Sequence, residues 1–114
     1  MSKVIISEEA IESMILNATL GVEGVLDTWK GFEEYIPYMN KDRQHPHGID
    51  FMLADNKLTI TVFVIVKYDY NLKKIGEEIQ NQIKSQIESM TPFTVTDVNV
   101  IIEDIIAQDA IRKK

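Results

Sequence analysis

The chain contains no cysteine, and this absence excludes disulfide bonds, thiolate nucleophiles and cysteine-ligated metal sites. No apolar run approaches the roughly 20 residues that a membrane-spanning helix needs. The first residues, Met1 to Val4, also lack the apolar core and the cleavage site of a secretory signal peptide. We therefore expect a cytoplasmic protein that does not insert directly into a membrane.

Positive charge is scarce as well. The 114 residues include 12 Lys and Arg against 18 Asp and Glu, which gives a formal net charge of −6. A general nucleic-acid binder needs clustered basic side chains, so we expect no nucleic-acid partner. Gly21 and Gly24 have the GxxG spacing of a KH-type RNA-binding loop, but Glu23 lies between them and no basic residue flanks them. The end of a helix and the following turn explain these glycines better.

Catalytic motifs are missing too, because the sequence has neither a nucleophile elbow nor a Gly-rich phosphate loop. We expect neither enzymatic activity nor a cofactor. His45 and His47 form the only histidine cluster, with Asp42 and Asp50 nearby, and two imidazoles with a carboxylate can bind zinc. Nothing fixes a fourth ligand, so a solvated loop is the default. A small-molecule-binding or metal-binding regulatory domain that uses residues 42–50 is the alternative function.

What the chain does contain is enough apolar surface, 45% of its residues, for a single domain spanning residues 1–114. Val4–Ile6 predicts a short edge strand. Ser7 predicts the start of a helix, because its side chain can cap free amides, and Gly21 predicts the end. The expected buried side of this helix comprises Ile11, Met14, Ile15 and Ala18. Val22–Leu26 predicts a second short extended stretch.

Two alternating runs, Ile49–Ala54 and Leu58–Lys67, predict a β-hairpin around Asp55-Asn56. A two-residue turn pairs Leu53 with Leu58, Phe51 with Ile60 and Ile49 with Val62. All six apolar side chains then share one face, and a shift of one residue would destroy this match.

A second helix is predicted to begin after the N-cap Asn71 and to end at Thr91-Pro92, since proline cannot continue the hydrogen-bond ladder. Its predicted core side comprises Leu72, Ile75, Ile79, Ile83, Ile87 and Met90. Val98–Ile102 predicts the last strand, and Asp104–Lys114 predicts a short C-terminal helix. The order β-α-β-β-α-β favours an α+β fold, in which a mostly antiparallel sheet carries both helices on one face.

The sheet face opposite these helices is expected to carry Met52, Phe63, Ile65 and Ile101, mixed with Thr59, Thr61, Asn99 and Lys67. This face is more apolar than a solvated face needs to be. One interpretation is that the C-terminal tail folds back over it. The other, compatible with the first, is that it binds a partner protein or a second copy of the chain.

The segment between the first helix and the hairpin is rich in aromatic residues. Its candidate binding residues are Trp29, Phe32, Tyr35 and Tyr38. Aromatic side chains concentrate binding energy at protein interfaces. An equally good explanation is that these residues cap one end of the core.

Several of these segments, taken in order, resemble the alkaline shock protein family. The segments are Val4–Ser7, Gly21–Val25, Tyr68–Leu72, Gln80, Met90-Thr91 and Val98–Val100. They resemble the family's opening strand and helix cap, its Val-x-Gly-Val turn, its Tyr-Gly-x-Asn-Ile turn, and its Gln, Met-Thr-Gly and Val-Asn-Val positions. Asp69 and Pro92 depart from the pattern, because the family usually has glycine there.

The resemblance spans about residues 3–104. It implies a cytoplasmic, non-enzymatic protein of stress or cell-envelope-stress response in Gram-positive bacteria. It also implies self-association into a homo-oligomer, protein partners, and a membrane-anchoring protein that holds the chain near the membrane.

Overall fold

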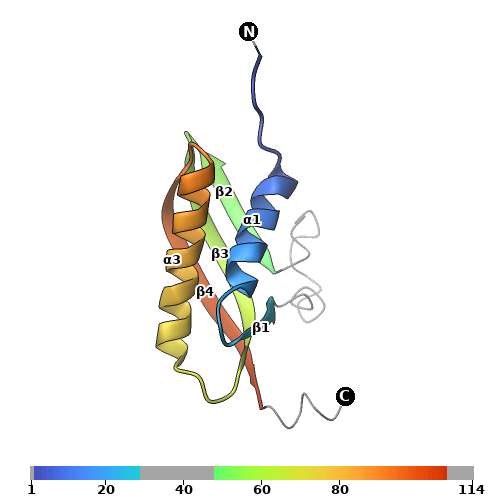
Figure 1. The fold of residues 1–114 in the computed structure, drawn as a ribbon, viewed down its shortest axis with the longest axis vertical. Coiled ribbons are helices and arrows are strands. Elements are labelled where there is room, and N and C mark those ends of the chain that lie inside the picture. Colours follow the sequence, from blue (N-terminus) through green and yellow to red (C-terminus); the bar gives the residue numbers. More distant parts are fainter. Residues whose placement is uncertain (1, 29–47, 108–114) are drawn as a thin grey trace, which may run out of the picture.

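A computed structural model describes residues 2–28 and 48–107 of the chain. Its elements are α1 (Glu8–Leu20), β1 (Val25–Thr28), β2 (Ile49–Ala54), β3 (Lys57–Lys67), α3 (Leu72–Met90) and β4 (Thr94–Ile106). Figure 1 shows both helices on the same side of a four-stranded sheet. This arrangement confirms the predicted α+β class with two helices on one face.

The central strand is β3, and all other strands pair with it. β1 and β2 are antiparallel to β3 and pair with Val64–Val66 and Lys57–Val62 respectively. β4 is parallel to β3 along its whole length. Because each strand has two edges, β1 and β2 share one edge of β3 and β4 occupies the other.

The hairpin has the predicted register. Leu53 pairs with Leu58, Phe51 with Ile60 and Ile49 with Val62. Asp55 and Asn56 both have positive φ, 54° and 62°, which is the geometry of the two-residue turn that matches strand twist. Turn and alternation therefore fix the same pairing.

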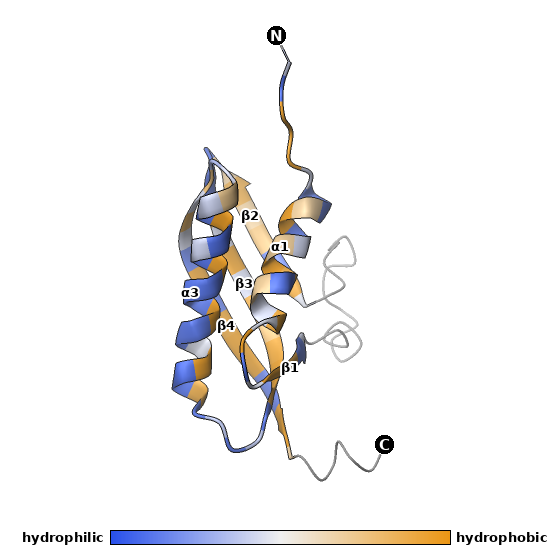
Figure 2. Cartoon of the chain, in the orientation of Figure 1, coloured by the Kyte–Doolittle hydropathy of each residue, from blue (hydrophilic) through white to orange (hydrophobic). Residues whose placement is uncertain are grey.

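Local sequence also sets the helix ends. The Ser7 side chain accepts a hydrogen bond from the Ala10 amide, and α1 ends at Gly21. The Asn71 side chain caps α3 in the same way through the Lys74 amide, and Thr91 ends that helix. Figure 2 shows α3 as largely hydrophilic on its outer side and the central strands as hydrophobic.

The core lies between the two helices and the sheet. Its fully buried members include Ile11 and Ile15 of α1, Ile79 and Ile83 of α3, and Val62 of β3. Met14 packs partly buried against them. The predicted core side of α3 holds at its centre but fails at its ends, because Leu72 and Met90 are 37% and 60% exposed. Only the end residues of α3 extend past the edge of the core, because Ile75 and Ile87 in its first and last turns are buried.

Three expectations for extended segments are corrected. Val4–Ile6 forms no strand within the described residues, and Val4 and Ile5 are 93% and 81% exposed. The strand expected at Val22–Leu26 lies at Val25–Thr28 instead. Asp104–Ile106 continues β4 rather than beginning a helix, because these residues pair with Ile65–Lys67. The rest of the predicted C-terminal helix lies outside the described residues.

Candidate interaction surface

The sheet face that the helices leave uncovered, here called the open face, carries four of the predicted binding residues. Phe63 and Ile65 lie on β3, Ile101 on β4 and Met52 on β2. Phe63 pairs directly with Ile101, and Ile65 follows two residues later on the same face. Phe63, Ile65 and Ile101 therefore form one apolar patch.

Met52 does not join this patch. It pairs with Thr59, which is four residues from Phe63 along β3, or roughly 13 Å at strand spacing. Met52 is also the most exposed of the four, at 70%, whereas Ile101 is 40% exposed and the other two are half-buried. The open face thus has one apolar patch and one separate exposed methionine.

Polar side chains separate the two. The hydroxyls of Thr59 and Thr96 are 3.3 Å apart, and Asn99 Nδ2 donates to Thr61 Oγ1 over 3.4 Å. These contacts link β3 to β4 and partly satisfy the polar groups. The middle of the open face is therefore hydrogen-bonded within the sheet.

The remaining predicted site residues cannot be placed. Trp29, Phe32, Tyr35, Tyr38, His45 and His47 lie outside the described residues. In the part of the chain that the structure describes, no three His, Asp or Glu side chains are grouped to hold a metal ion. Neither described helix is long and apolar enough to cross a membrane.

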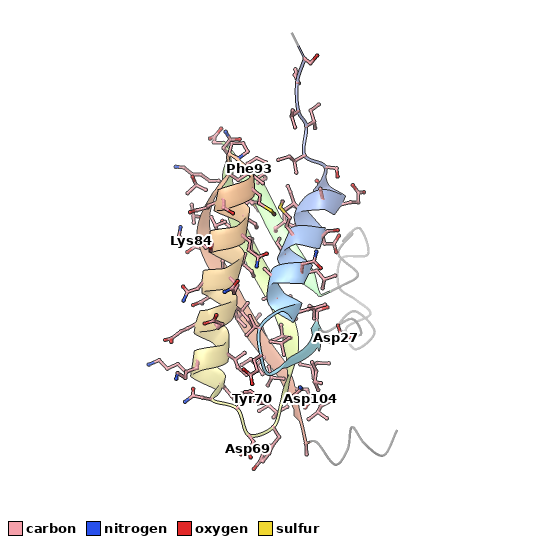
Figure 3. The ribbon with its side chains drawn as sticks, in the orientation of Figure 1. Asp27, Asp69, Tyr70, Lys84, Phe93 and Asp104 are labelled. Carbon is pink, nitrogen blue, oxygen red and sulfur yellow. The ribbon has the colours of Figure 1, made fainter. Side chains whose placement is uncertain are left out.

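Sequence reasoning missed the contact between the turn that follows α1 and the turn that precedes α3. Gly24 has φ of 99°, and a Cβ there would lie 2.8 Å from both Tyr70 Cδ2 and Ile75 Cδ1. Tyr70, labelled in Figure 3, also donates from its hydroxyl to Glu23 over 3.3 Å. The two turns belong to the segments Gly21–Val25 and Tyr68–Leu72, which both resemble the family pattern. This resemblance was the only sign in the sequence that the two turns matter, and it did not show that they touch.

A hollow of about 460 Å³ lies beside this contact. It is lined by Gly21, Val22, Glu23, Tyr70, Asn71, Lys74, Ile75, Glu78 and Gln82. Acidic and basic side chains are mixed along its wall, so its charge favours no single ligand class.

Side chains of α3 also bond to the outer edge of β4. Glu88 accepts from the Val95 amide over 2.8 Å, Lys84 donates to the Val95 carbonyl over 3.2 Å, and Gln80 donates to the Val98 carbonyl over 3.0 Å. Figure 3 shows Lys84 on this flank of α3. The Val95 amide, together with Lys84, lowers the pKa of Glu88 from its usual value of 4.5.

Fold and sequence patterns together place the chain in a known class. A family described as alkaline shock protein 23 (ASP23), with a cell envelope-related function, matches residues 1–107. The chain belongs to this family. It is 27% identical over 105 residues to the uncharacterized protein YqhY of Bacillus subtilis (strain 168), covering 92% of this chain and 78% of YqhY.

Solved structures share the fold at low sequence identity. A structure of a MamM CTD variant superposes with a TM-score of 0.59 at 14% identity, covering 86% of this chain and 98% of that one. A manganese form of another MamM CTD variant gives a TM-score of 0.58 at 13% identity, covering 86% and 99%. At such identities the likeness establishes the fold alone.

Proposed function

We propose that this chain is a cytoplasmic, non-enzymatic scaffold that serves the cell envelope by binding proteins. Its partners are further copies of itself and a membrane-anchoring protein. The family's cell envelope-related function supports the setting. The proposal of stress response and of Gram-positive origin rests on the resemblance of the sequence segments.

The observation that carries the binding role is the apolar patch on the open face. Phe63, Ile65 and Ile101 lie together on a sheet face that neither described helix covers. Apolar side chains exposed in this way cost free energy in water, and a protein partner recovers it by burying them. The aromatic segment with Trp29, Phe32, Tyr35 and Tyr38 is proposed as a second contact region.

A gentle crosslinking and co-purification experiment in native cells tests the proposal. Phe63→Asp and Met52→Lys are expected to reduce recovery of the protein partner by about tenfold or more, since each introduces charge into the open face. Met90→Lys is the matched control, because Met90 is 60% exposed at the end of α3 rather than on the open face. Thermal melts verify that each variant is folded.

Undiminished recovery with folded Phe63→Asp and Met52→Lys would exclude the open face as the binding surface. Trp29→Ala tests the aromatic segment separately. Metal binding through residues 42–50 stays an alternative prediction, because His45 and His47 lie outside the described residues.

A further inference from the structure

The outer edge of β4 differs between its two halves. Strand residues whose side chains face the helices direct their backbone groups to the outer edge, as the contacts of Val95 and Val98 with α3 show. The side chain of Ile106 lies on the open face of the sheet, and its carbonyl accepts a hydrogen bond from the Tyr68 amide, on the β3 side of β4. The register of β4 against β3 shifts at Thr96 and at Glu103, so the remaining helix-facing positions, whose backbone groups point outward, are Val100, Ile102 and Ile105.

The first half of this edge is covered by α3. Gln80, Lys84 and Glu88 recur every four residues along one flank of the helix, and each bonds to the β4 backbone between Val95 and Val98. The preceding position on this flank is Gly76, where an added Cβ would meet nothing within 4 Å. Glycine inside a helix costs about 1 kcal/mol relative to alanine, and here it leaves space beside the strand.

The second half of the edge is open. Among the described residues, no strand pairs with it and no side chain bonds to the outward groups of Val100 and Ile102. The stretch Asn99–Ile102 contains neither charge nor proline, two of the features with which natural edge strands avoid pairing. Such an edge is a template for an added strand.

The same chain has an extended segment that suits a strand but pairs with no strand among the described residues. Val4 and Ile5 are 93% and 81% exposed in an extended arm before α1, although β-branched residues favour strands. Ile6 packs against the core and Ser7 caps α1, so the arm, Ser2–Ile5, is anchored at its C-terminal end. Figure 1 shows it projecting beyond the body of the protein.

The arm cannot pair with the open edge of β4 in its own chain. It leaves α1, which lies over the β1 and β2 side of the sheet, whereas the open edge belongs to β4 on the far side of β3. Length and charge fit the edge of another copy. The arm and the stretch Asn99–Ile102 each contain four residues, or about 13 Å of strand, and Lys3 meets an edge bracketed by Asp97 and Glu103.

We propose that Ser2–Ile5 of one copy adds as a strand to the outer edge of β4 at Asn99–Ile102 of the next copy. This inference rests on the self-association proposed above and assigns its surface. The contact is heterologous, since the arm and the edge are different surfaces. Each copy therefore donates one arm and accepts another.

Sedimentation of the full chain tests this assignment with two variants that each remove one side of the contact. Val4→Asp charges the exposed arm, and Gly76→Lys places a long cationic side chain beside the open edge. We expect each variant alone to associate at least about tenfold more weakly, a loss of about 1.4 kcal/mol. Mixed together, they are expected to form a one-to-one complex, because each retains the surface that the other lacks.

Matched controls keep the test specific. Val4→Ile preserves strand preference and Gly76→Ala adds no side chain long enough to reach the edge, so both are expected to associate like the wild type. Wild-type association in Val4→Asp and Gly76→Lys would overturn the inference and leave open-face self-association standing. The inference would also be overturned if both variants lost association and their mixture formed no complex. That result would indicate that the arm and the edge of different copies do not bind each other.

A wild-type chain that stays monomeric at its highest soluble concentration would overturn both the strand addition and the proposed self-association. Binding to a membrane-anchoring protein is judged separately by Phe63→Asp and Met52→Lys in the co-purification experiment. The two proposals therefore fail under different results.

Discussion

Gly24 is the residue whose identity the fold constrains most clearly. Its φ of 99° is unfavourable for any residue with a Cβ, and that Cβ would lie 2.8 Å from the ring of Tyr70 and from the end of Ile75. The position thus combines a backbone requirement with a close approach. Through this contact, the turn that follows α1 packs against the start of α3.

Gly24→Ala is therefore expected to reduce the free energy of unfolding by about 2 kcal/mol. Urea denaturation measures the change. Gly76→Ala is the internal comparison and is expected to act in the opposite direction, because its Cβ enters open space and alanine favours the helix. Equal effects at both glycines would contradict this interpretation of Gly24.

At the scale of elements, the contact between α3 and β4 contains the group with a shifted pKa. The Val95 amide and Lys84 stabilise the ionised form of Glu88, so its pKa in the folded chain is lower than in the unfolded chain. The unfolded chain consequently binds a proton more readily. Stability from Glu88 is present above pH 4.5 and is lost as the pH falls through the lowered pKa.

Glu88→Gln is expected to make unfolding less pH-dependent over that acidic range, because the substituted amide does not titrate. Thermal melts between neutral and acidic pH measure the dependence. Glu77→Gln removes an exposed carboxylate of the same helix and serves as the comparison. An unchanged pH profile in Glu88→Gln would show that the contact with Val95 contributes nothing to it.

Elements fixed by neighbouring residues were predictable from the sequence. The hairpin register followed from Asp55-Asn56 and strict alternation, and the helix ends followed from Ser7 and Asn71. The partner of β4 was not predictable, because alternation identifies a strand but not its neighbour or its direction. Val4–Ile6 was predicted to be a strand because β-branched residues favour strands. That preference does not show whether a sheet edge lies within reach of the segment.

The candidate site divides in the same way. Alternation correctly placed Phe63, Ile65, Ile101 and Met52 on one face. The predicted hairpin register also implies that Met52 lies opposite Thr59, four residues from Phe63. The position of Ile101 beside Phe63 was not predictable, because the stagger of β4 against β3 depends on residues far apart in sequence. The contact of Gly24 with Tyr70 joins residues far apart in sequence, and no local pattern reveals it.

At the scale of the whole molecule, the pairing of β3 with β4 connects distant parts of the chain. Thr59 and Thr96 face each other across this pair although 37 positions separate them, whereas β2 and β3 adjoin through two residues. Bringing distant segments together has a larger entropic cost than closing a short hairpin. The hairpin is therefore expected to form before β4 docks.

Two conservative substitutions measure this folding order. Ile49→Val in the hairpin and Ile102→Val in β4 each remove one methyl group from the packed face, at an expected cost of about 1 kcal/mol. We expect Ile49→Val mainly to slow refolding and Ile102→Val mainly to accelerate unfolding in stopped-flow urea jumps. The reverse assignment would place β4 in the folding nucleus.

Late docking of β4 has a consequence for the newly made chain. Until α3 has been synthesised and β4 has paired, one whole edge of β3 lacks its native neighbour. The apolar centre of β3 is then open to wrong strands, including those of other unfinished chains. The interval between completion of the hairpin and arrival of β4 is thus the stage at which misassembly competes most directly with folding.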